Sequence, residues 1–208
     1  MNIKLVVLDA MGVIYIARDD VKELLIPFLR RKGCRVSDDV IYSLYKSCSL
    51  GRFSSMEFWH QLQVQEPGES LDSEYIQGHV LSDGLLDFLQ KMKAHDIPVA
   101  CLSNDVLEWA QKLQHFHHLD EYISFWVISG AVGVRKPDAE IYEILMRNTG
   151  YGSRNCVFID DHLENLDTAN RLGFTTLLFA ADQTQSFSSK HAIVSSFREI
   201  ESLINICE

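Results

Sequence analysis

Polar side chains follow four short apolar segments of this sequence, at or shortly after the end of each apolar run. They are Asp9, then Ser103 and Asn104, then Lys136 in the loop after the third segment, and finally the pair Asp160 and Asp161. If the apolar segments are strands of one parallel sheet, their carboxyl ends meet at one edge, where such sheets bind ligands. We therefore expect three carboxylates, a hydroxyl, an amide and an ammonium group to surround one pocket.

These residue types suit phosphoryl transfer assisted by a hard metal ion. Clustered carboxylates raise one another's pKa values unless a cation neutralises them, and a site with only oxygen ligands favours Mg²⁺. Lys136 and the metal could stabilise charge on a phosphoryl group, to whose oxygens Ser103 could donate. One carboxylate could then attack phosphorus and form an aspartyl-phosphate.

Each polar group also has an ordinary structural interpretation. An Asp after a strand often serves a turn, Ser and Asn before a helix are common N-cap residues, and acidic pairs are enriched at helix N-termini. Lys136 precedes a proline in a loop, where a lysine is usually solvated. One at a time these interpretations are preferable, but the recurrence of such groups after four apolar runs favours a shared site.

The elements that must position these groups form an alternating α/β pattern. Short apolar runs rich in β-branched residues predict strands buried on both faces, over residues 4–8, 97–102, 124–128, 155–159 and 175–179. Apolar residues at helical spacing lie between the later runs, around residues 85–92, 106–113, 141–145 and 166–172. The alternation predicts a doubly wound parallel sheet, and a last helix is expected around residues 197–204.

Residues 17–80 break the alternation, because they contain helical patterns around residues 21–29 and 40–45 and no convincing strand. We predict that they form a small helical module inserted into a core built from residues 1–16 and 81–208. Aromatic residues of this insertion, including Phe53, Phe58 and Trp59, either line a substrate pocket or fill the module's own interior.

Composition narrows the possible partners. The 208 residues carry a formal net charge of −10, which argues against nucleic acid or an anionic membrane as a partner but allows a phosphorylated small molecule. No apolar run approaches the roughly 20 residues that span a bilayer, and the N-terminus lacks secretory signal features. The five scattered cysteines form no CxxC pair, as expected of a reduced cytoplasmic protein. A monomer and a homodimer are both compatible with the sequence.

The four motifs together resemble those of the haloacid dehalogenase superfamily. LVVLDAMGV resembles the first motif, LSND the second, VRKPDAEIY the third and FIDDHLENLDTANRLG the fourth. This resemblance spans residues 4–180 and implies a Rossmann-like core, and the insertion is similar to the helical cap of subfamily I members. RKPDAEIYE is similar to small sugar-phosphate phosphatases and to the phosphatase domain associated with epoxide hydrolases. The resemblance thus implies a small phosphorylated metabolite as the substrate.

The resemblance also implies a role for each motif residue. Asp9 would be the nucleophile and, with the backbone carbonyl of Met11, a ligand of Mg²⁺. Asp161 would bind the metal directly, with Asp160 assisting directly or through water. Two further motifs would supply the residues that hold the phosphoryl oxygens and balance their charge, namely Ser103, Asn104 and Lys136.

Met11 departs from the family pattern, because phosphatases of this group usually carry an Asp there that protonates the leaving alcohol and then activates water. A thioether does neither, and loss of such a group typically costs about 10²–10⁴-fold in rate. The chain could be a phosphatase that uses good leaving groups or another acid, or a catalytically weak protein that binds a phosphorylated ligand. It could also be a dehalogenase, since DAMG resembles the DAYG of haloacid dehalogenases, although their fourth motif is less similar to this sequence. A phospho-receiver signalling domain fits less well, because its acidic pair follows the first strand.

Overall fold

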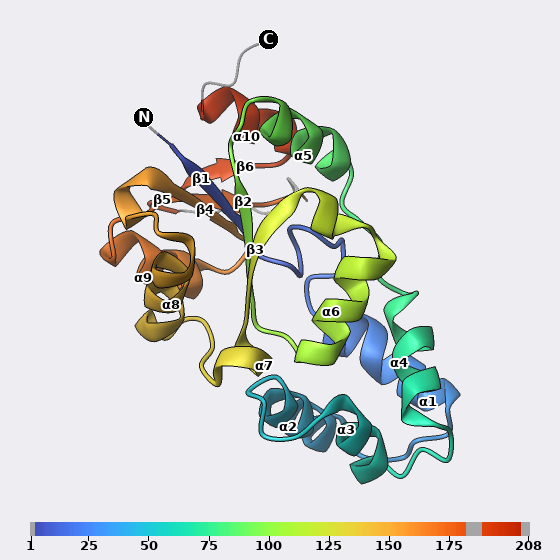
Figure 1. The fold of residues 1–208 in the computed structure, drawn as a ribbon. Coiled ribbons are helices and arrows are strands. Elements are labelled where there is room, and N and C mark those ends of the chain that lie inside the picture. The colour runs from blue at the N-terminus through green and yellow to red at the C-terminus, as the bar shows by residue number, and fades with distance from the viewer. Residues whose placement is uncertain (1–2, 182–188, 205–208) are drawn as a thin grey trace.

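A parallel sheet forms the centre of the molecule (Figure 1). The structure is a computed structural model that describes residues 3–181 and 189–204. The strand order is β3-β2-β1-β4-β5-β6. The described strands are β1 (Leu5–Leu8), β2 (Val99–Ser103), β3 (Ile123–Ile128), β4 (Cys156–Asp160), β5 (Thr175–Phe179) and β6 (Ala192–Val194). The chain runs outward from β1 to β3 and then crosses to the other side of β1, so β1 and β4 flank the point where the strand order reverses.

The five predicted strands are confirmed as β1 to β5, with small shifts at their ends. The sequence reasoning missed β6, which pairs with β5 through Leu177 opposite Ala192 and Leu178 opposite Ile193. Ala192 and Ile193 are exposed, and the strand lies at the edge of the sheet. A short, partly exposed edge strand lacks the continuous apolar run that identifies the other strands.

Helices cover both faces of the sheet, so the predicted doubly wound α/β fold is confirmed. Alternate residues of β1 show the two layers, because Val6 and Leu8 pack in one apolar cluster and Leu5 and Val7 in the other. The first cluster includes residues of α5 (Leu85–Ala94), α6 (Leu107–Phe116) and α10 (Phe197–Leu203), and the second those of α8 (Ala139–Thr149) and α9 (Leu163–Arg171). Figure 1 shows α8 and α9 on the side of the sheet opposite α5 and α6. Three short helical turns complete the core: η2 (Leu119–Glu121), α7 (Ser129–Val132) and η3 (Ser153–Asn155).

Helices occupy the segment between β1 and α5, which contained the predicted helical patterns. They are η1 (Val21–Leu25), α1 (Ile26–Arg31), α2 (Asp38–Cys48), α3 (Ser55–Gln61) and α4 (Gly68–Ile76), and we call this segment the helical module. Phe58 and Trp59 of α3 are buried, where they pack against each other and against Trp109 of α6. These two aromatic side chains therefore fill the interior and do not line the cavity described below.

A buried carboxylate joins the helical module to the core. Asp72 of α4 is 2% exposed and accepts hydrogen bonds from the indole Nε1 of Trp59 at 2.7 Å and of Trp109 at 2.5 Å. The hydroxyl of Ser55 donates to its other oxygen at 2.8 Å. Because Trp109 belongs to the core helix α6, this carboxylate fixes one side of the module against the sheet domain.

The two connections between module and core lie side by side. The amide of Ile16 donates to the Val80 carbonyl at 3.0 Å, and the amide of Ser82 donates to the Ile14 carbonyl at 2.9 Å. The module thus begins and ends at a paired segment next to β1, which holds it over the carboxyl edge of the sheet.

Among the described residues, no helix combines the length and apolar character needed to cross a membrane.

Candidate active site

The predicted site residues that follow strands meet at the carboxyl edge of the sheet. Asp9 comes directly after β1, Ser103 ends β2 and Asp160 ends β4, and β1 pairs with both of the other strands. The amide of Asp9 donates to the carbonyl of Ile159 at 2.9 Å, which fixes the first carboxylate beside the end of β4. The expected convergence at one edge is therefore observed.

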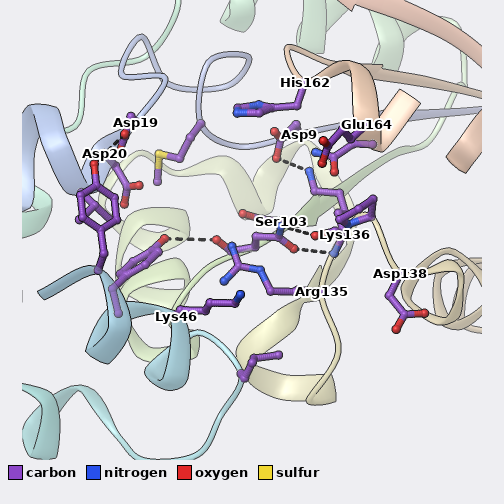
Figure 2. A pocket seen from close by; sticks show the side chains of 18 of the residues that line it. Asp9, Asp19, Asp20, Lys46, Ser103, Arg135, Lys136, Asp138, His162 and Glu164 are labelled. Atoms are coloured by element: carbon purple, nitrogen blue, oxygen red, sulfur yellow. Dashed lines mark hydrogen bonds and ion pairs between the residues drawn. The ribbon is translucent and has the colours of Figure 1, made fainter. Parts of the chain in front are cut away.

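Lys136 lies between two of the three carboxylates. Its Nζ lies 2.5 Å from Asp9 Oδ1, a contact drawn in Figure 2. The same atom lies 2.9 Å from Asp160 Oδ2, and the lysine side chain is 1% exposed. Although burial alone would lower the pKa of Lys136, its contacts with Asp160 and Asp9 raise it above the ordinary value. Lys136 is therefore a fixed positive charge at the base of the site.

The carboxyl group of Asp9 is destabilised as an anion in the absence of a cation. Burial and the neighbouring Asp160 raise the pKa of Asp9 to about 8, although Lys136 acts in the opposite direction. One lysine thus does not balance the clustered carboxylates at neutral pH. A bound divalent cation would favour the ionised form of Asp9, which is the form that can attack an electrophile.

Asp160 is completely buried and its oxygens are held from several sides. Besides Lys136, the backbone amide of His162 donates to Oδ1 at 2.7 Å, and Asn165 Nδ2 lies 3.0 Å from Oδ2. These contacts fix the orientation of the carboxylate and leave it little freedom to move. Asp160 is therefore suited to orient the residues around it.

Asp161 faces two groups that the sequence reasoning did not identify. Arg18 Nε donates to Oδ2 at 2.8 Å, and His162 Nδ1 lies 2.6 Å from Oδ1. Burial would raise the pKa of Asp161, but His162 and Arg18 hold it below its usual value, and Asp161 in turn raises the pKa of His162 to about 9. His162 could have been noticed because it directly follows the acidic pair. Arg18 carries no sequence signal, because its approach depends on how the connection to the module folds.

The carboxylates are spaced as a metal ion would require. One ligand atom from each of Asp9, Asp160, Asp161 and His162 can be chosen so that all lie within 4.8 Å of one another. Three of the four residues offer oxygen, the donor that suits Mg²⁺. The donor set and the raised pKa of Asp9 therefore fit a hard divalent cation.

Gly12 leaves room for the Asp161 carboxylate. Its φ of +77° lies in the left-handed region, and a Cβ at this position would lie 2.5 Å from Asp161 Oδ2. A side chain at position 12 would therefore collide with a carboxylate of the site. This close approach explains why glycine follows Met11 in the segment DAMG.

The remaining predicted residues line a cavity of about 940 Å³ above these groups. Ser103, Asn104 and Met11 all border it, together with residues of the helical module. Within the described part of the chain, the Ser103 hydroxyl makes no hydrogen bond, so it is free to donate to a ligand. Met11 is 8% exposed and presents no acid to the cavity. No described contact tests the direction of its backbone carbonyl, which stays a prediction.

Asn104 has a structural contact that the sequence did not indicate. Its side-chain Nδ2 donates to the Lys136 carbonyl at 3.0 Å, and its Oδ1 accepts from the Lys136 amide at 2.8 Å. This double hydrogen bond fixes the backbone that carries Lys136. The side chain of Asn104 therefore positions the lysine, and its contact with phosphoryl oxygens stays a prediction.

Another buried carboxyl group borders the same cavity from the module side. Asp20 is 6% exposed and accepts a hydrogen bond from the Tyr75 hydroxyl at 3.2 Å. Burial raises the pKa of Asp20 to about 6. Figure 2 shows Asp19 and Asp20 on the side of the cavity away from Lys136.

Comparisons with known proteins agree with this architecture. Residues 3–173 match the family model described as haloacid dehalogenase-like hydrolase. The chain is 30% identical over 102 residues to the chloroplastic flavin mononucleotide hydrolase 1 of Arabidopsis thaliana, a match that covers 49% of this chain and 41% of that protein. It is 26% identical over 132 residues to the sesquiterpene phosphatase astK of Aspergillus oryzae, covering 61% of this chain and 67% of the relative.

The fold has also been observed in solved structures. A family enzyme from Bacteroides thetaiotaomicron, solved with magnesium and inorganic phosphate, aligns with a TM-score of 0.73 and 20% identity. The alignment covers 89% of this chain and 97% of that enzyme. Since the family model covers most of the sequence and the structure shows the corresponding sheet, helices and clustered carboxylates, this chain belongs to the haloacid dehalogenase-like hydrolase family.

Proposed function

We propose that this protein is a Mg²⁺-dependent phosphatase that hydrolyses a small phosphorylated metabolite through an aspartyl-phosphate on Asp9. The observation that carries the proposal is the cluster of Asp9, Lys136, Asp160 and Asp161, in which Asp9 and Lys136 border the cavity. Two curated relatives named as a flavin mononucleotide hydrolase and a sesquiterpene phosphatase support a phosphate ester as the substrate.

The metal would be held by Asp9 and Asp161, with the Met11 carbonyl and Asp160 completing the protein's share of the ligands. A bound Mg²⁺ supplies positive charge that stabilises the ionised Asp9 and the oxygens of the transferring phosphoryl group. Arg18 and His162 donate to the Asp161 oxygens in this structure, so we expect them to release at least one oxygen when the ion binds.

The chain's own residues divide the reaction into two displacements. In the first, a carboxylate oxygen of Asp9 attacks phosphorus, the bond from phosphorus to the ester oxygen breaks, and that oxygen leaves with the bonding electrons as an oxyanion that takes its proton from water. Lys136 and Ser103 stabilise the charge on the phosphoryl oxygens. In the second, water attacks the phosphorus of the aspartyl-phosphate, which returns the Asp9 carboxylate and releases inorganic phosphate.

Met11 determines which esters should react well. Because no acid at position 11 protonates the leaving oxygen, alcohols that leave readily as anions are favoured over alkyl alcohols. The carbon–halogen alternative arises from the same feature, since a halide leaves without a proton. We favour the phosphatase because Asp160 and Asp161 lie with Asp9 in a set of hard ligands that a metal-free dehalogenase does not need.

The helical module would act as a cap, and we propose residues 17–80 as its extent. It contributes several residues that border the cavity, including Asp20, Tyr45 and Lys46.

The cysteines within the described residues are unpaired, in keeping with the cytoplasm as the expected compartment, while Cys207 lies outside the described residues.

The experiment compares wild type with Asp9→Asn on an aryl phosphate and a panel of sugar phosphates, with Mg²⁺ and with a chelator. The proposal predicts turnover that requires Mg²⁺ and falls by about 10⁴-fold in the variant, because the nucleophile is lost. Asp120→Asn is the matched control, since Asp120 is exposed in η2 away from the cavity, and it should keep full activity.

Other outcomes of this experiment would support the alternatives. Halide release from a haloacid in the presence of chelator, without phosphate release, would favour the dehalogenase. Binding of phosphorylated ligands without any turnover would favour the weak or non-catalytic binder. Turnover that survives in Asp9→Asn would contradict the proposed nucleophile.

A further inference from the structure

Two basic side chains border the cavity in addition to Lys136, Arg18 and His162. Arg135 lies in the loop before α8, and Lys46 lies in α2 of the helical module. Lys136, Arg18 and His162 are each paired with carboxylates of the proposed metal site. Within the ranges 3–181 and 189–204, neither Arg135 nor Lys46 makes an ion pair. In a protein with a formal net charge of −10, two unpaired cations in one cavity stand out.

A serine holds the Arg135 guanidinium next to the backbone of Lys46. Arg135 Nη1 donates to Ser49 Oγ at 3.2 Å, and the same hydroxyl donates to the Lys46 carbonyl at 3.2 Å. Ser49 is itself fixed to the core, because the Ser129 hydroxyl donates to its carbonyl at 2.5 Å. Only one of the five guanidinium N–H donors of Arg135 is thereby used within the described residues. The others are available to a ligand.

The carboxylates that border the cavity do not neutralise this pair. Figure 2 shows Asp19 and Asp20 on one side of the view and Asp138 and Glu164 on the other, away from the side chains of Lys46 and Arg135. Asp19 is engaged elsewhere, since it accepts a hydrogen bond from the Tyr42 hydroxyl at 2.8 Å. The cavity, at about 940 Å³, is also much larger than one phosphoryl group needs. It therefore has both space and positive charge left over beyond the reacting phosphate.

From this arrangement we infer that Arg135 and Lys46 form a second anion-binding subsite, so that the substrate carries a second anionic group, a carboxylate or a phosphate, beside the phosphate ester. The inference rests on the proposed phosphatase function and specifies its substrate class. Arg135 suits either anion, because its planar guanidinium can donate two parallel hydrogen bonds. Since Lys46 belongs to the module and Arg135 to the core, a doubly anionic substrate would also connect the two parts across the cavity.

The test uses substrate pairs that differ only in the second anionic group. Phosphoglycerate against glycerol phosphate tests a carboxylate, and a sugar bisphosphate against its monophosphate tests a second phosphate. For each pair we define the ratio of kcat/KM for the doubly anionic member to kcat/KM for the singly anionic member. This ratio is measured for wild type, Arg135→Gln and Lys46→Gln. Lys4→Gln is the charge-matched control, because Lys4 is exposed just before β1, at the opposite end of that strand from Asp9.

We expect the ratio to favour the doubly anionic member of at least one pair in wild type and in Lys4→Gln. It should fall about 10- to 100-fold in Arg135→Gln or Lys46→Gln, the usual effect of losing one charge-assisted hydrogen bond. The pair that shows the preference identifies the anion as carboxylate or phosphate. An unfolded variant would be recognised by its loss of activity toward both members, which leaves no ratio to compare, and the other variant then decides.

Two results would overturn the inference. The first is that wild type hydrolyses both members of each pair equally. The second is that the ratios are unchanged in both cation variants while phosphatase activity is intact. If no phosphate ester is hydrolysed at all, the proposed function fails separately. The subsite is then judged by calorimetric binding of the same compounds to the Mg²⁺-loaded Asp9→Asn protein, where equal affinity for both members of each pair would refute it.

Discussion

Replacement of Gly12 by alanine would test how closely the first motif approaches the metal site. In the structure, a Cβ on residue 12 lies 2.5 Å from Oδ2 and 2.6 Å from Cγ of Asp161. Non-bonded atoms do not approach so closely. The Asp161 carboxylate must therefore move away from the position in which it lies close to Asp9. Because Arg18 and His162 hold the same carboxylate, its displacement also disturbs those two contacts.

The expected magnitude has two separable parts. The left-handed φ of +77° at residue 12 costs a non-glycine residue roughly 1–2 kcal/mol, which should appear as a lower free energy of unfolding. Displacing a metal ligand should raise the Mg²⁺ concentration for half-maximal activity by about 10- to 100-fold, as loss of orienting contacts does at other metal sites. Gly84 offers a matched control, because its φ is +78° and nothing lies within 4 Å of a Cβ built there.

The assay is a Mg²⁺ titration of aryl phosphate hydrolysis together with urea unfolding, for Gly12→Ala, Gly84→Ala and wild type. Both variants should lose a similar amount of stability from the backbone conformation, but only Gly12→Ala should require more Mg²⁺. The reasoning would be refuted if the two variants showed the same Mg²⁺ dependence, because the collision with Asp161 would then be without consequence.

The remaining predictions concern the missing acid and two buried carboxyl groups. Met11→Asp should raise turnover of alkyl phosphates relative to aryl phosphates, by up to about 10²-fold, because an acid is restored beside the leaving oxygen. No change in that ratio in a folded variant would mean that another group already protonates the alcohol. Asp20 has a pKa of about 6 in the folded protein, against an ordinary value of 3.8. The protonated form of Asp20 therefore stabilises the fold fully below pH 3.8, and this stabilisation is lost as the pH rises through about 6. The free energy of unfolding of Asp20→Asn, measured with urea relative to that of wild type, should therefore rise by roughly 2–3 kcal/mol between about pH 4 and pH 7.5. A difference between the two proteins that stays constant with pH would contradict this. Asp72→Ala leaves the indole donors of Trp59 and Trp109 buried without an acceptor and should cost about 3–5 kcal/mol, whereas Asp72→Asn, which retains an acceptor, should cost less. Equal losses in the two variants would show that the carboxylate does not act through these hydrogen bonds.

The sheet could be predicted because its central strands are buried on both faces. Residues such as Val6 and Val7 of β1 must both be apolar, although they face opposite layers, and this produces a continuous apolar run. β6 has no such requirement, because Ala192 and Ile193 are exposed at the edge of the sheet. Burial on both faces therefore explains why the central strands could be predicted, and exposure at the edge explains why β6 was missed.

The site could be predicted only where it depends on strand ends. Asp9 and Asp160 meet because parallel strands place their carboxyl ends together, and this follows from the order of the apolar runs. The contacts of Arg18 with Asp161 and of Asn104 with the Lys136 backbone depend on the paths of loops, which no periodic pattern encodes. The contacts between the helical module and the core could not be predicted either, because they too depend on the paths of the connecting loops.

Detection of a phosphoryl group on Asp9 would test the central claim most directly. Wild-type protein would be mixed with a phosphate ester and Mg²⁺, quenched in acid within one turnover, and its peptides analysed by mass spectrometry. The account predicts the added mass of one phosphoryl group on the peptide containing Asp9, dependent on Mg²⁺ and absent from Asp9→Asn. Hydrolysis with no label on Asp9, or with the label on another residue, would contradict it.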